Sequence, residues 1–488
     1  MNPAVGVLAL LLVAVATALI GFYGLRVSRT TGDFYVASRT VRPWWNASAI
    51  GGEYLSAASF LGVAGLILVS GTDALWFPIG YTAGYLMLLL FVAAPLRRSG
   101  AYTIPDFTEA RLDSPGARRV TSALVVVVGW FYIVPQLQGA GLTIRITTGL
   151  PAWSGAVAVV VVVCLTVVAG GMRSITFVQA FQYWLKLTAL AVPAAFILVH
   201  LAGTGRSFPD SAAVYTAALD PQGPASLYRT LSLVIALLFG TLGLPHVLVR
   251  FYTNPDGRSA RRTTLIVLGL LSVFYLFPTI YGALARAFAP DLAAGGQADA
   301  AVLLLPGRLV PGPAGDALTA LVVAGAFAAF LSTTSGLVVS LAGVVSQDLF
   351  GGSVKGFRTA AVLSAAVPLL VALSTDSGAL AGSVGLVFAF TASTICPMLL
   401  LGIWWRGLTP AGAVAGMSAG ALLCGGAILI GAQVAPAGPV HELLAQPAAW
   451  TVPAAFAVMV SVSRATKGQS PAAVTRIMTR LHAPERTY

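Results

Sequence analysis

A glutamate lies in the middle of an apolar stretch of the chain, beside two glycines and two serines. The stretch reads AIGGEYLSAASFLG from residue 49 to residue 62. A carboxylate at the centre of a lipid bilayer costs at least about 2.5 kcal/mol, and each glycine costs a helix about 1 kcal/mol relative to alanine. Because these residues do not suit a simple membrane span, we expect Glu53 and its neighbours to line a cavity.

A break in this helix would create a binding site for ions. If the helix unwinds at Gly51 and Gly52, the backbone carbonyls around Gly52 and Leu55 become free to bind a cation. The half-helix that resumes near Ser56 and Ser59 points the positive end of its dipole toward any anion. The alternative is a tight crossing of two helices that needs the glycines only for close packing.

A second stretch of the same kind reads FGTLGLPHVLVRF from residue 239 to residue 251. Its two glycines and its proline predict a second broken helix. Two interrupted helices in corresponding positions of two five-helix halves are typical of transporters built from inverted repeats. His246 could bind a ligand, carry a proton or act as a structural donor. For Arg250 we expect a paired position at the cytoplasmic edge rather than contact with a substrate.

Four consecutive hydroxyl residues, Ser332 to Ser335, lie in the middle of a third apolar segment. One serine or threonine alone can bond to the carbonyl four residues earlier, so it would mean little. Four in a row, beside alanine and glycine, indicate helix contacts together with oxygen ligands. Hard monovalent cations prefer such ligands, and two hydroxyls with three carbonyls would form a sodium site without an acidic residue.

Two further helices carry buried polar groups. Tyr132, Gln136 and Gln138 lie within two turns of one another, and they either bond to neighbouring helices or line a path. Lys186 lies deep in its helix, about 18 Å from the helix start at 1.5 Å per residue. It could attract a carboxylate, pair with a carbonyl, or lie nearer the far surface.

Composition identifies an all-α integral membrane protein. The chain has 488 residues, of which 57% are hydrophobic and only 9% charged, and its mean hydropathy is +0.87. Charged residues make up about 25% of a typical soluble domain. Spans of about 20 apolar residues match the bilayer, and we expect about thirteen such helices. They lie near residues 3–24, 44–70, 74–97, 118–146, 152–171, 174–202, 227–252, 261–288, 314–348, 357–375, 378–404, 408–433 and 447–464.

The formal charge of +12 reflects orientation in the membrane. With the N-terminus outside, 22 of the 28 Lys and Arg residues fall on the cytoplasmic side. The positive-inside rule therefore predicts an external N-terminus and a cytoplasmic C-terminus, and we expect no nucleic-acid partner. The three cysteines, Cys164, Cys396 and Cys424, lie inside expected helices without close spacing, so we expect apolar filling rather than a disulfide or a metal site.

Four motifs resemble the sodium:solute symporter family, and within it the acetate permease branch of bacterial monocarboxylate transporters. They are GEYLSAASFLG at residues 52–62, GGM at 170–172, GTLGLPH at 240–246 with Arg250-Phe251, and AFLST at 329–333 with Asp348-Leu349. Many relatives carry an aspartate where Gln179 stands here, which puts a second sodium site in doubt. The acetate branch shares this glutamine.

The resemblance implies a LeuT-type inverted-repeat fold of five plus five helices, with one leading and two trailing helices. The expected divisions are residues 1–43 (leading helix and cytoplasmic loop), 44–202 (first repeat), 203–226 (extracellular loop), 227–404 (second repeat), 405–464 (trailing helices) and 465–488 (cytoplasmic tail). We also expect residues 289–313 to form a long extracellular loop.

The resemblance also implies one bound sodium ion. Its ligands would be the carbonyls of Gly52, Leu55 and Ala329 and the hydroxyls of Ser332 and Thr333. For the substrate, a small carboxylate, we expect contacts near the two broken helices and the polar part of the fourth helix. These substrate candidates are Ser56, Ala57, Ser59, Tyr132, Gln136, Thr241 and His246.

We therefore expect sodium-coupled uptake of acetate, propionate or pyruvate across a bacterial-type inner membrane. The alternatives are a proton-coupled symporter with Glu53 or His246 as proton carrier, and a sodium symporter for another small solute such as an amino acid. A solute sensor is less favoured, because the tail of roughly 25 residues is too short for a signalling domain of typical size. No enzyme activity is expected, because no metal-ligand cluster, nucleophile–base pair or cofactor loop is found. The oligomeric state is not predicted.

Overall fold

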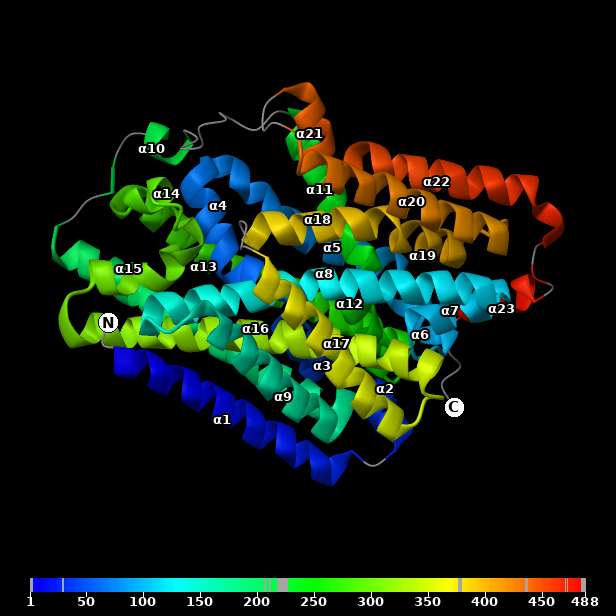
Figure 1. Ribbon diagram of the computed structural model, residues 1–488, viewed down its shortest axis with the longest axis horizontal. Helices are drawn as coiled ribbons and strands as arrows, with labels where there is room; N and C mark the ends of the chain where they lie inside the picture. Colours follow the sequence, from blue (N-terminus) through cyan, green and yellow to red (C-terminus); the bar gives the residue numbers. More distant parts are fainter. Residues whose placement is uncertain are drawn as a thin grey trace.

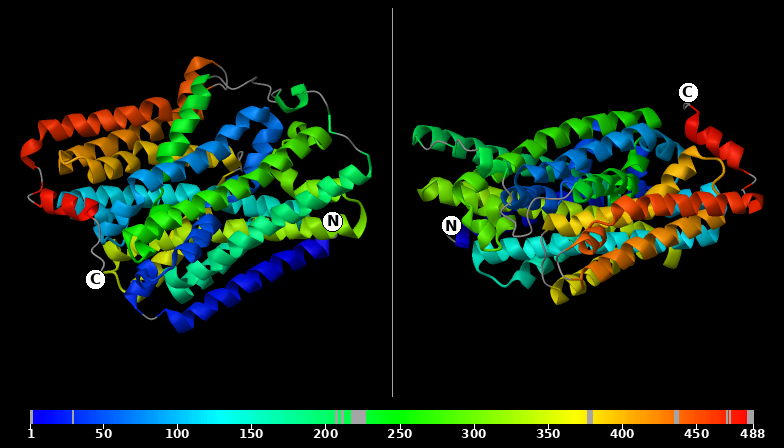
Figure 2. Two further views of the ribbon diagram at one scale, coloured as in Figure 1. Left: turned by 180° about the vertical axis from the view of Figure 1, so that it is seen from behind. Right: turned by 90° about the horizontal axis from the view of Figure 1, so that it is seen from above.

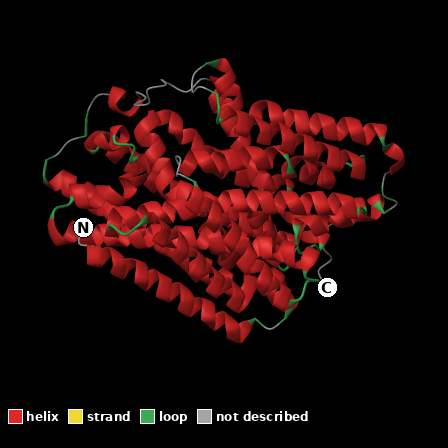
Figure 3. Cartoon of the chain, viewed as in Figure 1, coloured by secondary structure: helices red, strands yellow, loops and turns green. Residues whose placement is uncertain are grey.

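The protein is a bundle of helices. The computed structural model describes residues 3–28, 30–205, 208–209, 212–216, 227–375, 380–434, 438–469, 471 and 473–483. Within this part of the chain every regular element is a helix (Figure 3). Ten of the described helices are long and apolar enough to cross a membrane, and an eleventh span results if one bent pair is counted as a unit. The exact number of spans stays a prediction.

The helices of the first half surround the first expected break. They are α1 (Pro3–Val27), α2 (Thr31–Val36), α3 (Pro43–Tyr54), α4 (Val63–Ser70), α5 (Trp76–Phe91), α6 (Ala93–Ser99), α7 (Ile104–Leu112), α8 (Pro115–Thr148), α9 (Ala152–Gly203) and α10 (Ala212–Thr216). Short 3-10 or π segments are η1 (Ala37–Arg39), η2 (Ala58–Gly62) and η3 (Gly71–Leu75).

The helices of the second half surround the second break and the hydroxyl-rich segment. They are α11 (Leu227–Gly243), α12 (Pro245–Val249), α13 (Gly257–Phe288), α14 (Asp291–Ala294), α15 (Ala301–Leu309), α16 (Gly312–Leu349), α17 (Val354–Ser374), α18 (Leu380–Ser393), α19 (Ile395–Trp404), α20 (Pro410–Gly431), α21 (Pro439–Ala445), α22 (Ala448–Ala465) and α23 (Val474–His482). Short segments are η4 (Arg250–Thr253), η5 (Ala298–Ala300) and η6 (Lys467–Gln469).

The long helices run roughly side by side, with α1 along one edge of the bundle and α22 along the opposite edge (Figure 1). The hydroxyl-rich helix α16 lies inside, and its apolar window is 100% buried. Glycine, alanine, serine and threonine dominate the middle of α16, and such small side chains let neighbouring helices approach closely. This explains why a helix without a polar face lies at the centre, in contact with α9, α8 and α3.

The two ends of the bundle are formed by different short helices. Helices α6, α7 and α23 lie at one end, and α14 and α15 lie at the other (Figures 1 and 2). At the first end Arg118 forms ion pairs with Asp106, Glu109 and Asp348 at 2.7, 2.8 and 2.9 Å. The expected extracellular segment 289–313 is not an open loop, because α14, η5 and α15 form within it and pack on α4, α13 and α16. Most of the expected loop 203–226 lies outside the described residues.

Helix α9 contains two helices joined at Gly171, close to the boundary expected between the helices near residues 152–171 and 174–202. Gly171 has φ 54° and ψ −149°, a backbone conformation that only glycine adopts readily. A Cβ atom at this position would lie 2.7 Å from Cα of Phe34 in α2. The turn therefore needs glycine both for its conformation and for the close approach of α2.

We expect Gly171→Ala to destabilise the protein by about 3 kcal/mol or more, because backbone strain and overpacking add. The measurement is the thermal unfolding of the purified protein. Gly205→Ala is a matched control, since Gly205 also has a positive φ of 67° but no described atom within 4 Å of an added Cβ. Equal effects of the two substitutions would show that the contact with Phe34 is unimportant.

Candidate functional site

The first broken helix interrupts its hydrogen bonding at Leu55, three residues beyond the expected position. Gly51 and Gly52 are helical, and the chain leaves the helix at Leu55, which has φ −74° and ψ 83°. It resumes with η2 and α4. The glycines serve close packing instead, because a Cβ atom on Gly52 would lie 2.1 Å from the carbonyl oxygen of Gln179 in α9. The break is thus confirmed, but the glycines are not its location.

The second break lies where it was expected. Helix α11 ends at Gly243, Leu244 is extended with φ −67° and ψ 115°, and Pro245 begins α12. The two parts are bent by 40° relative to each other. Proline favours the first turn of a helix, because its missing N–H is not needed there.

Lys186 of α9 reaches the first break. Its ammonium group donates to the carbonyl of Leu55 at 2.8 Å, to the hydroxyl of Ser332 at 3.0 Å and to the carbonyl of Gly52. The side chain is fully buried. Of the three alternatives for this lysine, the structure therefore selects pairing with carbonyls.

The oxygens expected to bind sodium converge on this same place. The hydroxyl of Ser332 also donates to the carbonyl of Ala329 at 3.1 Å, and the hydroxyl of Thr333 donates to the carbonyl of Glu53 at 2.6 Å. The oxygen atoms suit a hard monovalent cation. However, the Lys186 amine already bonds to three of them, so the residues present do not fit an additional sodium ion in this arrangement.

Glu53 and Arg250 form a buried ion pair between the two broken helices. Nε of Arg250 donates to Oε2 of Glu53 at 2.6 Å, and the Arg250 side chain has 0% exposure. The guanidinium also donates to Thr176 at 2.9 Å and to the amide oxygen of Gln179. Arg250 therefore lies in the core and not at the cytoplasmic edge, because the carboxylate of the first broken helix provides its charge partner.

Gln179 connects this ion pair to the lysine. Its amide nitrogen donates to the carbonyl of Ser332 at 2.7 Å, while its amide oxygen accepts from Arg250. Among the described residues, this network contains one carboxylate, Glu53, and two cationic side chains, Arg250 and Lys186. When Lys186 is protonated, the network carries one unbalanced positive charge.

The expected substrate residues lie in two groups beside the breaks. In the first group, the N–H of Ala57 donates to the Gln136 side chain at 2.9 Å, and the rings of Tyr132 and His246 lie 5.1 Å apart. Ser56 directly precedes Ala57 in the chain and is also buried.

In the second group, Thr241 bonds to Tyr54 at 3.1 Å and Ser59 bonds to Tyr275 at 2.9 Å. Both groups are buried. Whether they bind a substrate stays a prediction.

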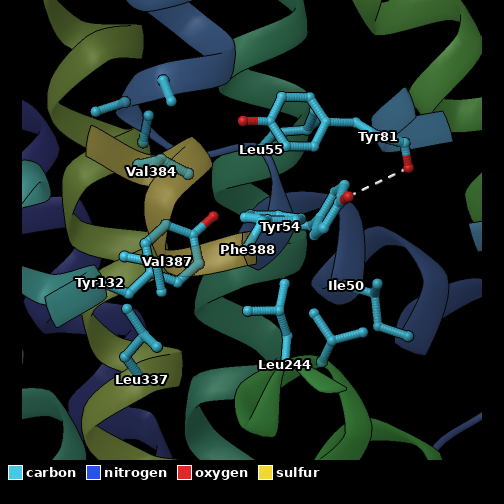
Figure 4. Packing of buried hydrophobic residues seen from close by; sticks show 14 of the residues in the cluster. Ile50, Tyr54, Leu55, Tyr81, Tyr132, Leu244, Leu337, Val384, Val387 and Phe388 are labelled. Carbon is cyan, nitrogen blue, oxygen red and sulfur yellow. Dashed lines mark hydrogen bonds between the residues drawn. The ribbon is translucent and has the colours of Figure 1, made fainter. Parts of the chain in front are cut away.

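An aromatic cluster, which the sequence analysis did not identify, joins these two groups. The rings of Tyr54 and Tyr132 lie 6.4 and 6.1 Å from that of Phe388, and Tyr81 stacks on Tyr275 at 6.0 Å. Figure 4 shows Tyr54, Tyr132 and Phe388 together in the core, with Leu55 and Leu244 of the two breaks on either side in this view. The sequence feature that could have predicted this cluster is the presence of tyrosines inside strongly apolar spans.

Several polar atoms beside this cluster have no partner among the described residues. They are the hydroxyls of Tyr81 and Tyr85, the amide nitrogen of Gln136 and both ring nitrogens of His246. Buried donors without partners are uncommon in native structures and need an explanation. A bound polar solute would supply such partners.

A cavity of about 490 Å³ opens between the breaks and the end of the bundle that carries α14. It is lined by Asp73, Phe77, Gln138, Arg145 and Asp299, among others. Burial raises the pKa of Asp299, and a hydrogen bond from the N–H of Leu380 lowers it to a smaller extent. Phe77 also lies 6.3 Å from Tyr81, so the cavity ends next to the aromatic cluster.

The described helices and the two paired breaks form the LeuT-type inverted-repeat fold, as expected. A Na⁺-coupled sialic acid symporter in a substrate-bound outward-open state is similar, with a TM-score of 0.70 and 17% identity over 94% of this chain and 97% of that chain. A nucleobase-cation-symport-1 family transporter in a closed conformation gives a TM-score of 0.56 and 13% identity, over 92% of this chain and 98% of that chain. These likenesses establish the fold.

The sequence places the chain within a family. Residues 34–420 match the sodium:solute symporter family. The uncharacterized symporter YwcA of Bacillus subtilis is 32% identical over 420 residues, which are 83% of this chain and 82% of the relative. The protein therefore belongs to the sodium:solute symporter family, which confirms the resemblance at the family level.

Proposed function

We propose that this protein takes up a short-chain monocarboxylate, such as acetate, propionate or pyruvate, together with a cation by alternating access. The observation that carries the proposal is the buried Lys186 amine at the first break, which in its protonated form has no carboxylate partner among the described residues. A buried charge is costly unless it is paired, and a small carboxylate would balance this one. A neutral or cationic solute would leave the positive charge of Lys186 unbalanced.

The surroundings of the two breaks support a small, partly apolar anion. The rings of Tyr54, Tyr132 and Phe388 leave little room and favour an apolar tail such as a methyl group. The amide nitrogen of Gln136 is a buried donor without a partner among the described residues, and it lies beside the start of the half-helix at Ala57. Donors at a helix N-terminus suit a carboxylate.

We further propose that the end of the bundle with α6, α7 and α23 faces the cytoplasm of a bacterial-type cell. Its supporting observation is the arginine-rich sequence of that end, which follows the positive-inside rule. In this orientation the cavity beside Asp299 opens to the outside, as uptake requires.

Uptake of radiolabelled acetate, pyruvate and proline into proteoliposomes tests the substrate. We expect a cation gradient to drive accumulation of acetate and pyruvate, and not of proline, because proline carries its own balancing ammonium group. An excess of unlabelled propionate should compete, whereas an excess of serine should not. Accumulation of proline without acetate would overturn the proposal.

For the cation that is transported together with the carboxylate, the family assignment favours sodium. Binding of sodium at the first break requires the Lys186 amine to leave the oxygens of Gly52, Leu55 and Ser332. In that case Ser332→Ala and Thr333→Ala would each raise the sodium concentration needed for half-maximal uptake. Unchanged sodium dependence in both variants would exclude these two hydroxyls as ligands.

A further inference from the structure

We propose that a groove between α5 and α13, on the outer surface of the bundle, binds an acyl chain of an anionic phospholipid whose headgroup lies on Arg258 and Arg261. The bound chain supports the first broken helix from outside the bundle. This lipid site is independent of the identity of the transported solute, so it holds or fails apart from the proposed function.

The groove has a volume of about 720 Å³ and lies on two membrane-spanning segments. Helices α5 and α13 pack against each other. Three long apolar side chains in the lining, Ile79, Leu86 and Leu276, are 51%, 46% and 60% exposed. The short side chains of Ala83 and Ser272, which also line the groove, leave room between them. Because lipid tails are about as apolar as leucine, such a surface suits an acyl chain.

The hydroxyl groups in the lining are already hydrogen-bonded within the protein. Thr82, Ser272 and Thr279 each donate to the carbonyl four residues earlier in their own helix, at 2.9 Å. The fourth hydroxyl, that of Tyr275, is hydrogen-bonded to Ser59 at 2.9 Å. A polar solute in the groove would lose its bonds to water without gaining new donors, which is costly. An acyl chain needs no such partners.

Two arginines extend the same face of α13 toward the end of the bundle that carries α6, α7 and α23. At 3.6 residues per turn, Arg261 lies about 20° and Arg258 about 40° from Ser272 around the helix. Both arginines are exposed, and neither forms an ion pair with a carboxylate in the part of the chain that the structure describes. Charge complementarity therefore favours a lipid with an anionic headgroup.

The length of the groove fits one leaflet of a bilayer. Arg261 and Tyr275 are about 21 Å apart along α13 at 1.5 Å per residue. One leaflet measures about 20–22 Å with its headgroups, so a lipid anchored at Arg261 reaches Tyr275 with its chain. Arg286, near the opposite end of α13, already donates to three backbone carbonyls of α4 and α10 at 3.0, 2.7 and 2.6 Å. The headgroup is therefore assigned to the Arg261 end.

Tyr275 connects the groove to the first break. It lines the groove, its exposure is 5%, and its ring stacks on that of Tyr81 at 6.0 Å. Its hydroxyl is hydrogen-bonded to Ser59 of η2, the segment with which the helix resumes after Leu55. A chain packed against the Tyr275 ring adds dispersion contacts that hold the ring in place. Occupancy of the groove therefore stabilises the resumed half of the broken helix.

The melting temperature of the purified protein in detergent tests the headgroup contact. We expect added phosphatidylglycerol to raise it saturably by a few degrees, and phosphatidylcholine with the same chains to raise it much less. Combining Arg258→Gln with Arg261→Gln should increase the phosphatidylglycerol concentration needed for half of the rise by about tenfold. Arg119→Gln, at an exposed position of α8, is the control and should leave it unchanged. An equal rise with phosphatidylcholine, or wild-type behaviour of the double variant, would overturn the proposal.

Ser272→Trp tests the groove itself, because the indole ring would fill the space of the chain. We expect the same tenfold increase in the phosphatidylglycerol concentration for half of the rise. Val273→Trp is the matched control, since Val273 is the next residue, is 48% exposed and does not line the groove. Equal effects of the two substitutions would refute binding in the groove, and if Ser272→Trp fails to fold, the arginine variants still decide. The alternative occupant is a second copy of the chain. A dimer in light scattering that becomes a monomer in Ser272→Trp would therefore also overturn the lipid proposal.

Hydrogen exchange tests the link to the first break. Saturating phosphatidylglycerol should slow amide exchange at residues 58–62 several-fold in the wild-type protein. Tyr275→Phe keeps the ring in the groove but loses the bond to Ser59, so we expect unchanged lipid affinity without this slowing. Exchange that does not respond to the lipid in the wild-type protein would refute the support of the broken helix. None of these measurements uses acetate, so a negative result leaves the proposed uptake untouched, and a failure of acetate uptake leaves the lipid site untouched.

Discussion

Arg250→Met is expected to abolish uptake and to destabilise the protein by about 3–5 kcal/mol, because it leaves a buried carboxylate without its partner. Arg250 has 0% side-chain exposure and Glu53 has 2%, so water cannot replace the lost guanidinium. The substitution also removes the donors to Thr176 and Gln179. Gln179 in turn donates to the carbonyl of Ser332, so the effect should reach the oxygens that surround the Lys186 amine.

A double-mutant cycle measures this coupling. Glu53→Gln in the Arg250→Met background removes the uncompensated charge, and we expect the double variant to be more stable than Arg250→Met alone. Thermal unfolding and yield of folded protein are the readouts for stability, and acetate uptake is the readout for function.

Arg308→Met provides the matched control, because Arg308 pairs with Asp291 at 2.7 Å but the two side chains are 40% and 63% exposed. Exposed pairs contribute about 0–1 kcal/mol, so this variant should behave almost as wild type. If Arg250→Met were no more harmful than Arg308→Met, the buried ion pair would not organise the site.

Gly52→Ala is expected to reduce uptake by about 100-fold, the effect of a shift of roughly 1 Å in a functional site. The added Cβ atom would lie 2.1 Å from the carbonyl oxygen of Gln179, which is backbone and cannot rotate away. Helices α3 and α9 would therefore have to separate. Separation would weaken the bonds from Lys186 to Gly52 and Leu55, which cross the same interface.

The uptake rate at saturating acetate measures this effect, and binding of a fluorescent conformational probe can show whether the helices have moved. Gly269→Ala is the control within a membrane helix, since no described atom lies within 4 Å of a Cβ atom at that exposed position of α13. Wild-type uptake by Gly52→Ala would mean that α3 and α9 can separate without disturbing the site.

Local sequence patterns were sufficient to predict the elements of this protein. The apolar runs predicted membrane helices, because a bilayer requires about 20 residues per span and satisfied backbone hydrogen bonds. Gly243 and Pro245 predicted the second break at its observed position, since proline cannot continue the preceding helix. The boundary expected between the helices near residues 152–171 and 174–202 likewise matches the break at Gly171.

The first break was predicted three residues too early, and the reason is informative. Glycine either ends a helix or allows another helix to approach, and the sequence does not distinguish these two uses. Gly52 turned out to serve the approach of α9, while the helix ends at Leu55. The expected position of Arg250 was wrong for a related reason, because its partner Glu53 lies almost two hundred residues away in the chain.

The sequence by itself determined a membrane protein of the sodium:solute symporter family with two interrupted helices and a hydroxyl-rich central helix. Only the tertiary structure decided which groups meet at the break. Lys186 is one polar residue in a long apolar helix, and its spacing to Gly52, Leu55 and Ser332 has no periodic signature. Its contact with their oxygens arises from the packing of α3, α9 and α16, a long-range property that no local pattern encodes.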